Sequence, residues 1–250
     1  MIIAVDAGNS RVRVALFRHG RLERLLRLPS DPGSREGRLP LALERLLRAA
    51  DVPDTEVRIG LSSVVPALTG LLEAALARWG PVARVEPGVA PGITVGYADP
   101  EQLGADRLAN AVAAAQAYGC PCLVADLGTA LTVDVVDGEC TLRGGVIFPG
   151  MEAARAALNR STAQIQAPCA PPAGPVGRNT REGVAAGLVY GYNALLGGLL
   201  VRLRQEVGSQ APAVLTGGGA WALVEPVPGV DAHDPYLTLR GIALFAAQGA

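Results

Sequence analysis

Two short segments of the chain share a residue pattern that could bind the same kind of ligand. In residues 2–10 and 122–130 an apolar run leads to an aspartate, Asp6 or Asp126, and a glycine follows two positions later. Glycine lets the backbone approach a ligand closely, carboxylate oxygens suit Mg²⁺, and turns rich in N–H groups bind anions. The duplicated pattern therefore predicts binding of a phosphate-containing ligand together with a metal ion.

Polar side chains after each aspartate strengthen this prediction. Asn9 and Ser10 in the first segment, and Thr129 in the second, can donate hydrogen bonds to phosphate oxygens, while Arg11 or Arg13 can add positive charge. One such turn would be a weak signal, because Asp and Gly are common in any hairpin. Two turns, each between apolar strand-like runs, are moderately specific.

Two further motifs supply what a phosphoryl transfer would need. Asp106 and Arg107 follow Gly104 and Ala105, so an acid and a base are adjacent after a glycine. At the N-terminus of a helix we expect the Asp106 carboxylate to stay ionised and to accept a proton; the alternative is a structural role at the helix end. The glycine-rich turn 216–219 could lie against an adenine, although alone it is better explained as a strand-to-helix connection.

The composition excludes several other functions. The chain has 250 residues, of which 50% are hydrophobic and 18% charged, as expected for a globular protein of one large or two small domains. A net charge of −1 gives no overall field that favours nucleic acid or a membrane. The 22 basic residues are all arginine, which excludes a Walker-type lysine and Schiff-base chemistry. With 2 histidines, neither a zinc cluster nor a Ser-His triad is expected.

The elements that would position these residues alternate between strands and helices. Each acidic turn belongs to a run of three predicted strands, at 2–6, 11–18 and 21–28 and again at 122–126, 131–137 and 140–147. Asp99-Pro100 has the pattern of a helix start and predicts a helix that runs to about Tyr118. Gly119-Cys120-Pro121 then breaks the chain, which predicts a domain boundary. Helices are also expected around 150–160, 180–205 and 235–248.

The sequence also leads to predictions about the cellular compartment of the protein and about the structure of one apolar segment. The 4 cysteines form no Cys-x-x-Cys pair, and no signal peptide is evident, which favours a reducing cytoplasm. Residues 183–201 carry no charge and approach the length of a membrane span. Their tyrosines, Asn193 and glycines favour a buried helix, at a subunit interface as one possibility, and a membrane span is the lesser alternative.

Taken together, the motifs resemble those of the type III pantothenate kinases, within the wider superfamily of acetate and sugar kinases, Hsc70 and actin. The resemblance covers nearly the whole chain. It rests on residues 6–10, 62–66, 104–107, 109–111, 126–130, 144–150, 179–180 and 216–218. Ser10 stands where the family usually has Thr, which keeps the hydroxyl, and the segment after Thr180 departs from the usual family pattern.

The resemblance implies an α/β fold of two ribonuclease H-like (actin-like ATPase) domains, 1–118 and 119–250, that face a central cleft. It implies ATP-dependent phosphorylation of pantothenate at its primary hydroxyl, the first step toward coenzyme A, by a cytoplasmic homodimer that spans no membrane. Asp106 would be the general base. The implied pantothenate site comprises Tyr97, Gly104, Ala105, Asp106, Arg107 and Thr180, with Thr180 acting across the dimer interface.

The resemblance also implies where the nucleotide and metal ions bind. The ATP contacts would be Asp6, Ala7, Gly8, Asn9, Ser10, Arg11, Val12, Arg13, Thr129, Gly217 and Gly218. Asp6 would hold Mg²⁺ either directly or through water, and Asp126 would bind a monovalent cation, K⁺ or NH₄⁺.

Two other functions fit the same residues. One is a kinase for another small alcohol, or a phosphatase, because a fold does not fix its substrate. The other is a non-catalytic protein that assists transcription, for which the arginine-rich segment 11–48 is the sole support; we interpret that segment as solvated faces rather than a nucleic-acid patch.

Overall fold

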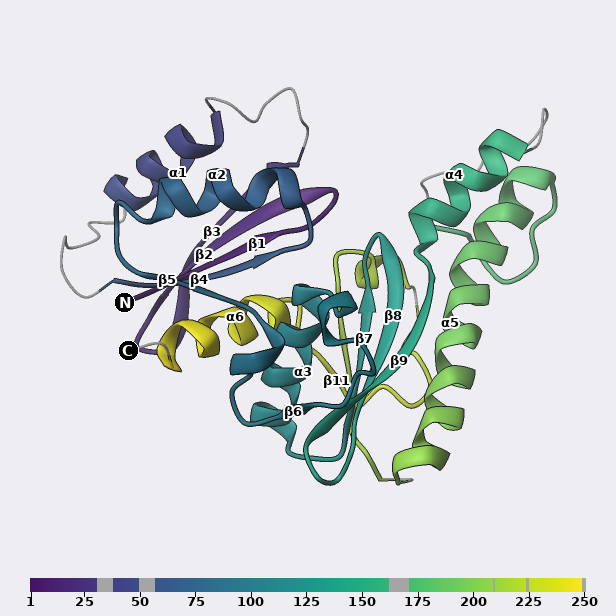
Figure 1. The fold of residues 1–250 in the computed structure, drawn as a ribbon. Coiled ribbons are helices and arrows are strands. Elements are labelled where there is room, and N and C mark those ends of the chain that lie inside the picture. Colours follow the sequence, from purple (N-terminus) through teal and green to yellow (C-terminus); the bar gives the residue numbers. More distant parts are fainter. Residues whose placement is uncertain (31–37, 50–56, 162–170, 209, 224, 249–250) are drawn as a thin grey trace. The chain divides into compact units, whose positions relative to one another are not determined.

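The chain forms two compact units in the computed structural model (Figure 1). The structure describes residues 1–30, 38–49, 57–161, 171–208, 210–223 and 225–248. Unit 1 contains Met1–Ala117 together with Tyr236–Ala250, and unit 2 contains Tyr118–Pro235. The predicted domains were 1–118 and 119–250. In the structure the final segment, which we expected in the second domain, belongs to unit 1.

Unit 1 is built on a five-stranded mixed sheet with the order β3-β2-β1-β4-β5. Strands β1 (Ile2–Ala7), β2 (Arg11–Arg18) and β3 (Arg21–Pro29) form an antiparallel meander. Strands β4 (Arg58–Ser63) and β5 (Val82–Arg84) continue the sheet parallel to β1. Strand β5 is too short to show a periodic pattern in the sequence, and we did not expect it.

Helices cover both faces of this sheet (Figure 1). Helices α1 (Arg38–Ala49) and α2 (Pro66–Leu76) pack through leucines on the face that carries Ile3, Val5 and Ala7. Helix α6 (Leu237–Gln248) packs on β1 and β4. Gly60 of β4 makes that contact possible, because a Cβ atom there would lie 2.4 Å from the carbonyl oxygen of Ile242.

The segment before α3 (Ala105–Tyr118) corrects the predicted helix start at Asp99. Residues Pro100–Gln102 form only a 3₁₀ turn, η3, and Asp99 makes no side-chain cap there. Leu103 is extended, so the helix begins after Gly104. An Asp-Pro pair fits either kind of turn, which is why the local pattern could not choose between them. A 3₁₀ turn η2 (Pro87–Val89) and a short strand β6 (Thr94–Val95) precede it.

Unit 2 repeats the strand order of unit 1. Strands β7 (Cys122–Leu127), β8 (Ala130–Val136) and β9 (Thr141–Pro149) form an antiparallel meander. Strands β10 (Ala213–Thr216) and β11 (Ala232–His233) lie parallel to β7, giving the order β11-β10-β7-β8-β9. The repeated meander was predicted from the two acidic turns, whereas β11, with its few residues, was not.

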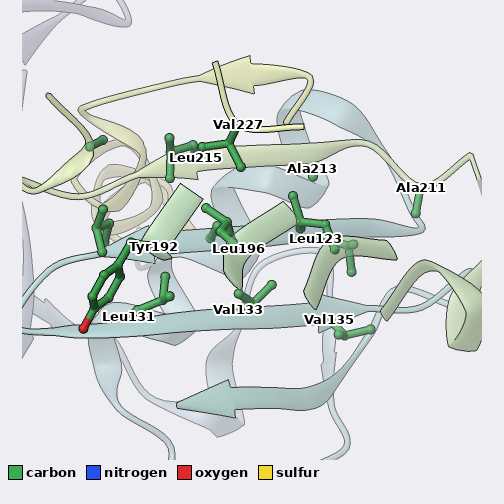
Figure 2. Close-up of a cluster of buried hydrophobic side chains, with 14 of the residues drawn as sticks. Leu123, Leu131, Val133, Val135, Tyr192, Leu196, Ala211, Ala213, Leu215 and Val227 are labelled. Atoms are coloured by element: carbon green, nitrogen blue, oxygen red, sulfur yellow. The ribbon is translucent and has the colours of Figure 1, made fainter. Parts of the chain in front are cut away.

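The core of unit 2 lies between this sheet and α5 (Thr180–Val207) (Figure 2). Tyr192 and Leu196 of the helix pack among the side chains of Leu123, Leu131 and Val133. In the described part of the chain, α5 is long and apolar enough to cross a membrane, but 44% of its apolar stretch is buried in the protein. We therefore identify it as the core helix of unit 2. Helix α4 (Met151–Ser161) and a 3₁₀ turn η4 (Ala220–Ala222) complete the unit.

A disulfide joins Cys120, before β7, to Cys140, before β9, within unit 2. The bond differs from the reduced thiols that we expected in a reducing cytoplasm. Cys122 is a buried free thiol, and burial raises its pKa to about 12, so it is unreactive at neutral pH. Cys169 lies outside the described residues.

Candidate active site

The first acidic turn joins β1 to β2 at the edge of unit 1. The N–H of Gly8 donates to the carbonyl oxygen of Arg11 at 3.0 Å, and the Ser30 hydroxyl donates to the carbonyl oxygen of Gly8 at 2.7 Å. The Gly8 N–H therefore closes the hairpin rather than facing a ligand. Asn9, Ser10 and Arg11 are exposed, so their side chains are accessible to a phosphate group.

Asp6 at the end of β1 is paired with a guanidinium. Its Oδ2 atom accepts hydrogen bonds from Nε of Arg13 at 3.0 Å and from Nη2 at 2.8 Å. Arg13 also donates to the hydroxyl of Thr238 on α6 at 3.0 Å. The two partners lie opposite one another on β1 and β2, which explains the short contact. Arg13, predicted to contact phosphate, here neutralises a carboxylate that is 5% exposed.

The second carboxylate of unit 1, Asp106, lies in the first turn of α3. Its Oδ1 atom accepts the N–H of Arg107 at 2.8 Å, and a Cβ atom at Gly104 would lie 2.7 Å from the same oxygen. Burial, and then the nearby charge of Asp6, raise the pKa of Asp106 above its ordinary value, and the Arg107 N–H opposes them. Burial and the charge of Asp6 therefore oppose the stabilisation that the N–H groups at the helix N-terminus give to the ionised carboxylate.

Arg107 and Tyr97 form a polar pair beside Asp106. The Arg107 side chain is 7% exposed, and its Nη1 atom donates to the Tyr97 hydroxyl at 2.8 Å. Its guanidinium carbon lies 5.5 Å from the centre of the Tyr97 ring. Unit 1 thus brings together Asp6, Gly104, Asp106, Arg107 and Tyr97, all of which we predicted to belong to the site.

The second acidic turn joins β7 to β8 and is enclosed by glycines. The Gly128 N–H donates to the carbonyl oxygen of Ala130 at 2.9 Å, closing the hairpin, and Thr129 is exposed at its tip. A Cβ atom at Gly150 would lie 2.3 Å from the Gly128 carbonyl oxygen, and one at Gly217 would lie 2.4 Å from Oδ1 of Asp126. Two glycine-rich motifs therefore pack directly on this turn, which explains why they contain glycine.

Asp126 lies between two threonines on neighbouring strands. Thr216 of β10 and Thr132 of β8 are both in register with Asp126, so the three side chains share one face of the sheet. Thr216 is fully buried and Thr132 is 8% exposed, and neither hydroxyl has a hydrogen-bond partner among the described residues. A carboxylate flanked by two uncommitted hydroxyl oxygens suits a cation with oxygen ligands. These oxygen atoms therefore fit the cation that the family resemblance implies at Asp126.

Tyr192 is a residue near this turn that sequence reasoning did not assign to the site. Its hydroxyl donates to the carbonyl oxygen of Pro149 at 2.7 Å, and its ring meets Phe148 edge to face with the centres 6.1 Å apart. Pro149 precedes Gly150, which packs on the turn. Tyr192 thus connects α5 to the second acidic turn. A lone tyrosine in an apolar helix gives no signal of such a contact.

Thr180 is the first residue of α5. Asn179 caps the helix by accepting the N–H of Glu182 at 3.0 Å, and its amide donates to the Glu182 side chain at 2.8 Å. The predicted start of this helix at residue 180 is confirmed, and Asn-x-x-Glu is a capping pattern that accounts for it. The Thr180 side chain is exposed and available to a ligand.

A cavity of about 430 Å³ in unit 2 is lined by residues on both sides of the glycine-rich turn 216–219. Its walls come from β10, η4, β11 and the segment between them, and include Leu215, Ala220, Leu223 and Val227. Its lining also includes Glu225, Asp231 and His233, so the walls are both apolar and polar.

Solved structures define the class of fold. The chain matches a putative Baf family transcriptional activator from Campylobacter jejuni with a TM-score of 0.61 and 17% identity, covering 99% of this chain and 98% of that one. It matches a glucokinase of the ROK family from Streptomyces griseus, solved with glucose and AMPPNP, with a TM-score of 0.56 and 15% identity, covering 99% of both chains. These similarities confirm the predicted two-domain fold of the actin-like ATPases and sugar kinases.

Sequence comparison then defines the family. The family model for type III pantothenate kinase matches residues 2–202. The type III pantothenate kinase of Thermomicrobium roseum is 37% identical, with 97% of this chain and 95% of the relative covered. That of Acidothermus cellulolyticus is 34% identical, with 98% and 97% covered. The chain belongs to the type III pantothenate kinase family.

Proposed function

We propose that this protein phosphorylates pantothenate at its primary hydroxyl with ATP, the first step of coenzyme A biosynthesis. Its membership of the family supports the reaction. The observation that carries the proposal is the group formed by Asp106, Arg107 and Tyr97 at the start of α3, beside Asp6. A carboxylate to accept a proton and a guanidinium to bind a carboxylate are the two groups that pantothenate, a carboxylic acid with a primary alcohol, requires.

Asp106 is the proposed general base. Its pKa lies above that of an ordinary aspartate, because it is buried and lies near Asp6, while the N–H of Arg107 favours the ionised form that a base requires. The raised pKa makes it a better proton acceptor than an exposed aspartate. The hydrogen bond from the Arg107 N–H fixes the orientation of the carboxylate. In-line phosphoryl transfer needs little more from the protein than such positioning and charge stabilisation.

Arg107 is proposed to bind the pantothenate carboxylate, with Tyr97, Gly104, Ala105 and Thr180 completing the substrate site. A buried guanidinium makes strong charge-assisted hydrogen bonds with a carboxylate. The hydrogen bond to the Tyr97 hydroxyl holds the side chain in one orientation before the substrate arrives. The substrate therefore meets a preorganised partner, which lowers the entropic cost of binding.

ATP contacts are assigned to residues 6–13 of unit 1 and to Thr129, Gly217 and Gly218 of unit 2. The exposure of Asn9, Ser10 and Thr129 supports this assignment. Mg²⁺, when bound with ATP, neutralises charge on the phosphates, and Asp6 would hold it directly or through water. Asp126 would hold K⁺ or NH₄⁺ with the help of the neighbouring threonine hydroxyls.

We also propose that two copies of the chain form a homodimer in the cytoplasm. The exposed face of α5 carries small residues at helical spacing, Gly187, Gly191, Ala194 and Gly198, and continues to Val201, which is 57% exposed. Ile147 and Phe148 of the same unit are also exposed. We propose that a second copy of the chain covers this apolar surface. Light scattering of the purified protein would test this by measuring its molar mass in solution.

A coupled assay of ADP release tests the proposed reaction. We expect turnover with pantothenate that depends on Mg²⁺ and increases with K⁺. A panel of other alcohols, including N-acetylmannosamine and glucose, tests the alternative kinases, and equal activity on these would contradict the proposal. Salt-dependent DNA binding without kinase activity would instead favour the non-catalytic alternative.

A further inference from the structure

Ser62, at the end of β4, is a buried hydroxyl without a hydrogen-bond partner among the described residues. It is fully buried, and its Oγ atom neither donates nor accepts a hydrogen bond in the described structure. Leaving a buried polar atom unpaired is unfavourable, because the atom has lost its hydrogen bonds to water. Such an atom calls for an explanation, and an ordered water or an ion is a common one.

The position of Ser62 in the sheet identifies its neighbour. Ser62 is in register with Asp6 on the adjacent parallel strand β1. Paired residues on neighbouring strands project to the same face, so the hydroxyl lies beside the Asp6 carboxylate. Val64, two residues after Ser62, packs near the start of α3, because its side chain lies 3.8 Å from where a Cβ atom of Gly104 would be. Ser62 therefore belongs to the part of unit 1 that carries Asp6 and Asp106.

The Asp6 carboxylate has hydrogen-bonding capacity left on the same face. Both hydrogen bonds from Arg13 go to Oδ2, and Oδ1 accepts none from the described residues. An uncommitted carboxylate oxygen next to an unpaired hydroxyl favours a hydrated cation.

Unit 2 has the same arrangement at the equivalent position. Thr216 on β10 is in register with Asp126 on β7, as Ser62 on β4 is with Asp6 on β1. Its hydroxyl is likewise fully buried without a partner among the described residues. The two units differ at the antiparallel neighbour of the aspartate. In unit 1 Arg13 on β2 lies opposite Asp6, whereas in unit 2 Thr132 on β8 lies opposite Asp126. A hydroxyl beside the central aspartate is therefore common to both units, whereas the guanidinium is not.

We propose that Ser62 is a positioning residue of the phosphoryl-transfer site, whose hydroxyl, together with Oδ1 of Asp6, binds a water molecule of the hydrated Mg²⁺ that accompanies ATP. The inference rests on the proposed kinase function. The hydroxyl is fully buried, and a water molecule that also bonds a second polar group is a common partner of such an atom. Arg13 neutralises one oxygen of Asp6, and the water takes the other.

Nucleotide binding with and without Mg²⁺ tests this role apart from turnover. We would measure the affinity of the full-length protein for ADP by calorimetry, once with Mg²⁺ and once with EDTA. Ser62→Ala is expected to weaken Mg²⁺·ADP binding about tenfold, the effect of one hydrogen bond within a charged network, and to leave metal-free ADP binding unchanged. Ser62→Thr keeps the hydroxyl and should retain most of the Mg²⁺ effect.

Ser63→Ala is the matched control. Ser63 is in register with Ala7 on the opposite face, and its hydroxyl accepts a hydrogen bond from Thr69 at 2.9 Å. This variant should lose some stability but keep the Mg²⁺ effect on ADP binding. If Ser62→Ala does not fold, Ser62→Cys, which preserves the size of the side chain and weakens its hydrogen bonding, replaces it.

Two results would overturn the role of Ser62. One is an unchanged Mg²⁺·ADP affinity in Ser62→Ala, and the other is an equal loss of affinity with and without Mg²⁺, which would indicate a purely structural effect. Failure of the kinase proposal is separately visible, because wild-type protein would then bind Mg²⁺·ADP without phosphorylating pantothenate.

Discussion

At the scale of single residues, the proposed role of Asp106 as general base leads to predictions about turnover and its pH dependence. We expect Asp106→Asn to fold normally and to lose on the order of 10²–10⁴ in turnover, since an amide cannot accept the proton of the acceptor hydroxyl. Steady-state assays with pantothenate would measure kcat and KM. The wild-type enzyme should also lose kcat/KM on acidification at a pH above the ordinary aspartate pKa, because the pKa of Asp106 is raised. Near-wild-type turnover in the variant would remove Asp106 from its proposed role.

The same substitution should stabilise the fold at neutral pH. A carboxyl whose pKa is raised in the folded state holds its proton there at pH values where the unfolded chain has lost it. Ionised Asp106 therefore lowers stability above its folded pKa, and this effect disappears below 3.8, the ordinary pKa of an aspartate. Denaturant melts of both proteins should show Asp106→Asn to be the more stable at neutral pH, with the difference vanishing once the pH falls below that ordinary value. A variant that is less stable at neutral pH would show that Asp106 makes a net favourable contact.

At the scale of elements, glycines determine how closely helices and turns pack. A Cβ atom at Gly241 of α6 would lie 1.9 Å from the carbonyl oxygen of Ala109 on α3. Gly241→Ala should therefore force the helices apart and cost about 1–3 kcal/mol or more in the free energy of unfolding. Gly70 of α2 has nothing within 4 Å of its Cβ position. Gly70→Ala is the control and should gain up to about 1 kcal/mol, and urea melts of both variants would measure the contrast.

The contact between α5 and β9 makes a second prediction at this scale. Tyr192→Phe removes the hydrogen bond to the Pro149 carbonyl and should cost about 1 kcal/mol of stability. Because Pro149 precedes the glycine that packs on the second acidic turn, we also expect a higher KM for ATP. Tyr190→Phe serves as the control, since Tyr190 makes no hydrogen bond with the described residues. Equal KM values in the two variants would show that this contact does not position the turn.

Local sequence patterns predicted most helices and strands, but they did not predict which elements pack against one another. The two meanders were predicted because each strand alternates or runs apolar for several residues around an acidic turn. Strands β5 and β11 have too few residues to show a period. The partner of α6 was wrongly expected to be the second half, because an apolar helix face does not specify which sheet it will cover. The proposed site residues Asp6 and Gly104–Arg107 were predicted from motifs. Residues 62–66 were also recognised as a motif, but the roles proposed for Ser62 and Tyr192 depend on contacts with residues distant in sequence, which a motif does not reveal.

At the scale of the whole molecule, the disulfide in unit 2 makes a prediction about stability. It closes a segment with a sequence separation of 20, for which chain entropy predicts about 3 kcal/mol of stabilisation. A phosphine reductant should therefore lower the melting temperature of the wild-type protein. A Cys120→Ser/Cys140→Ser variant should melt at the lower temperature with or without reductant. A melting temperature that does not change on reduction would indicate that the two thiols are not bonded in solution.

The return of α6 to unit 1 has a consequence for how the enzyme is made. A ribosome synthesises all of unit 2 before it reaches Leu237. A chain that stalls after Pro235 already contains both acidic turns, but it lacks the helix that packs on β1 and β4 and supplies Thr238 to Arg13. The face of the sheet that α6 covers in the finished protein is then exposed, so we expect the unfinished chain to be less stable and more readily degraded than the complete one.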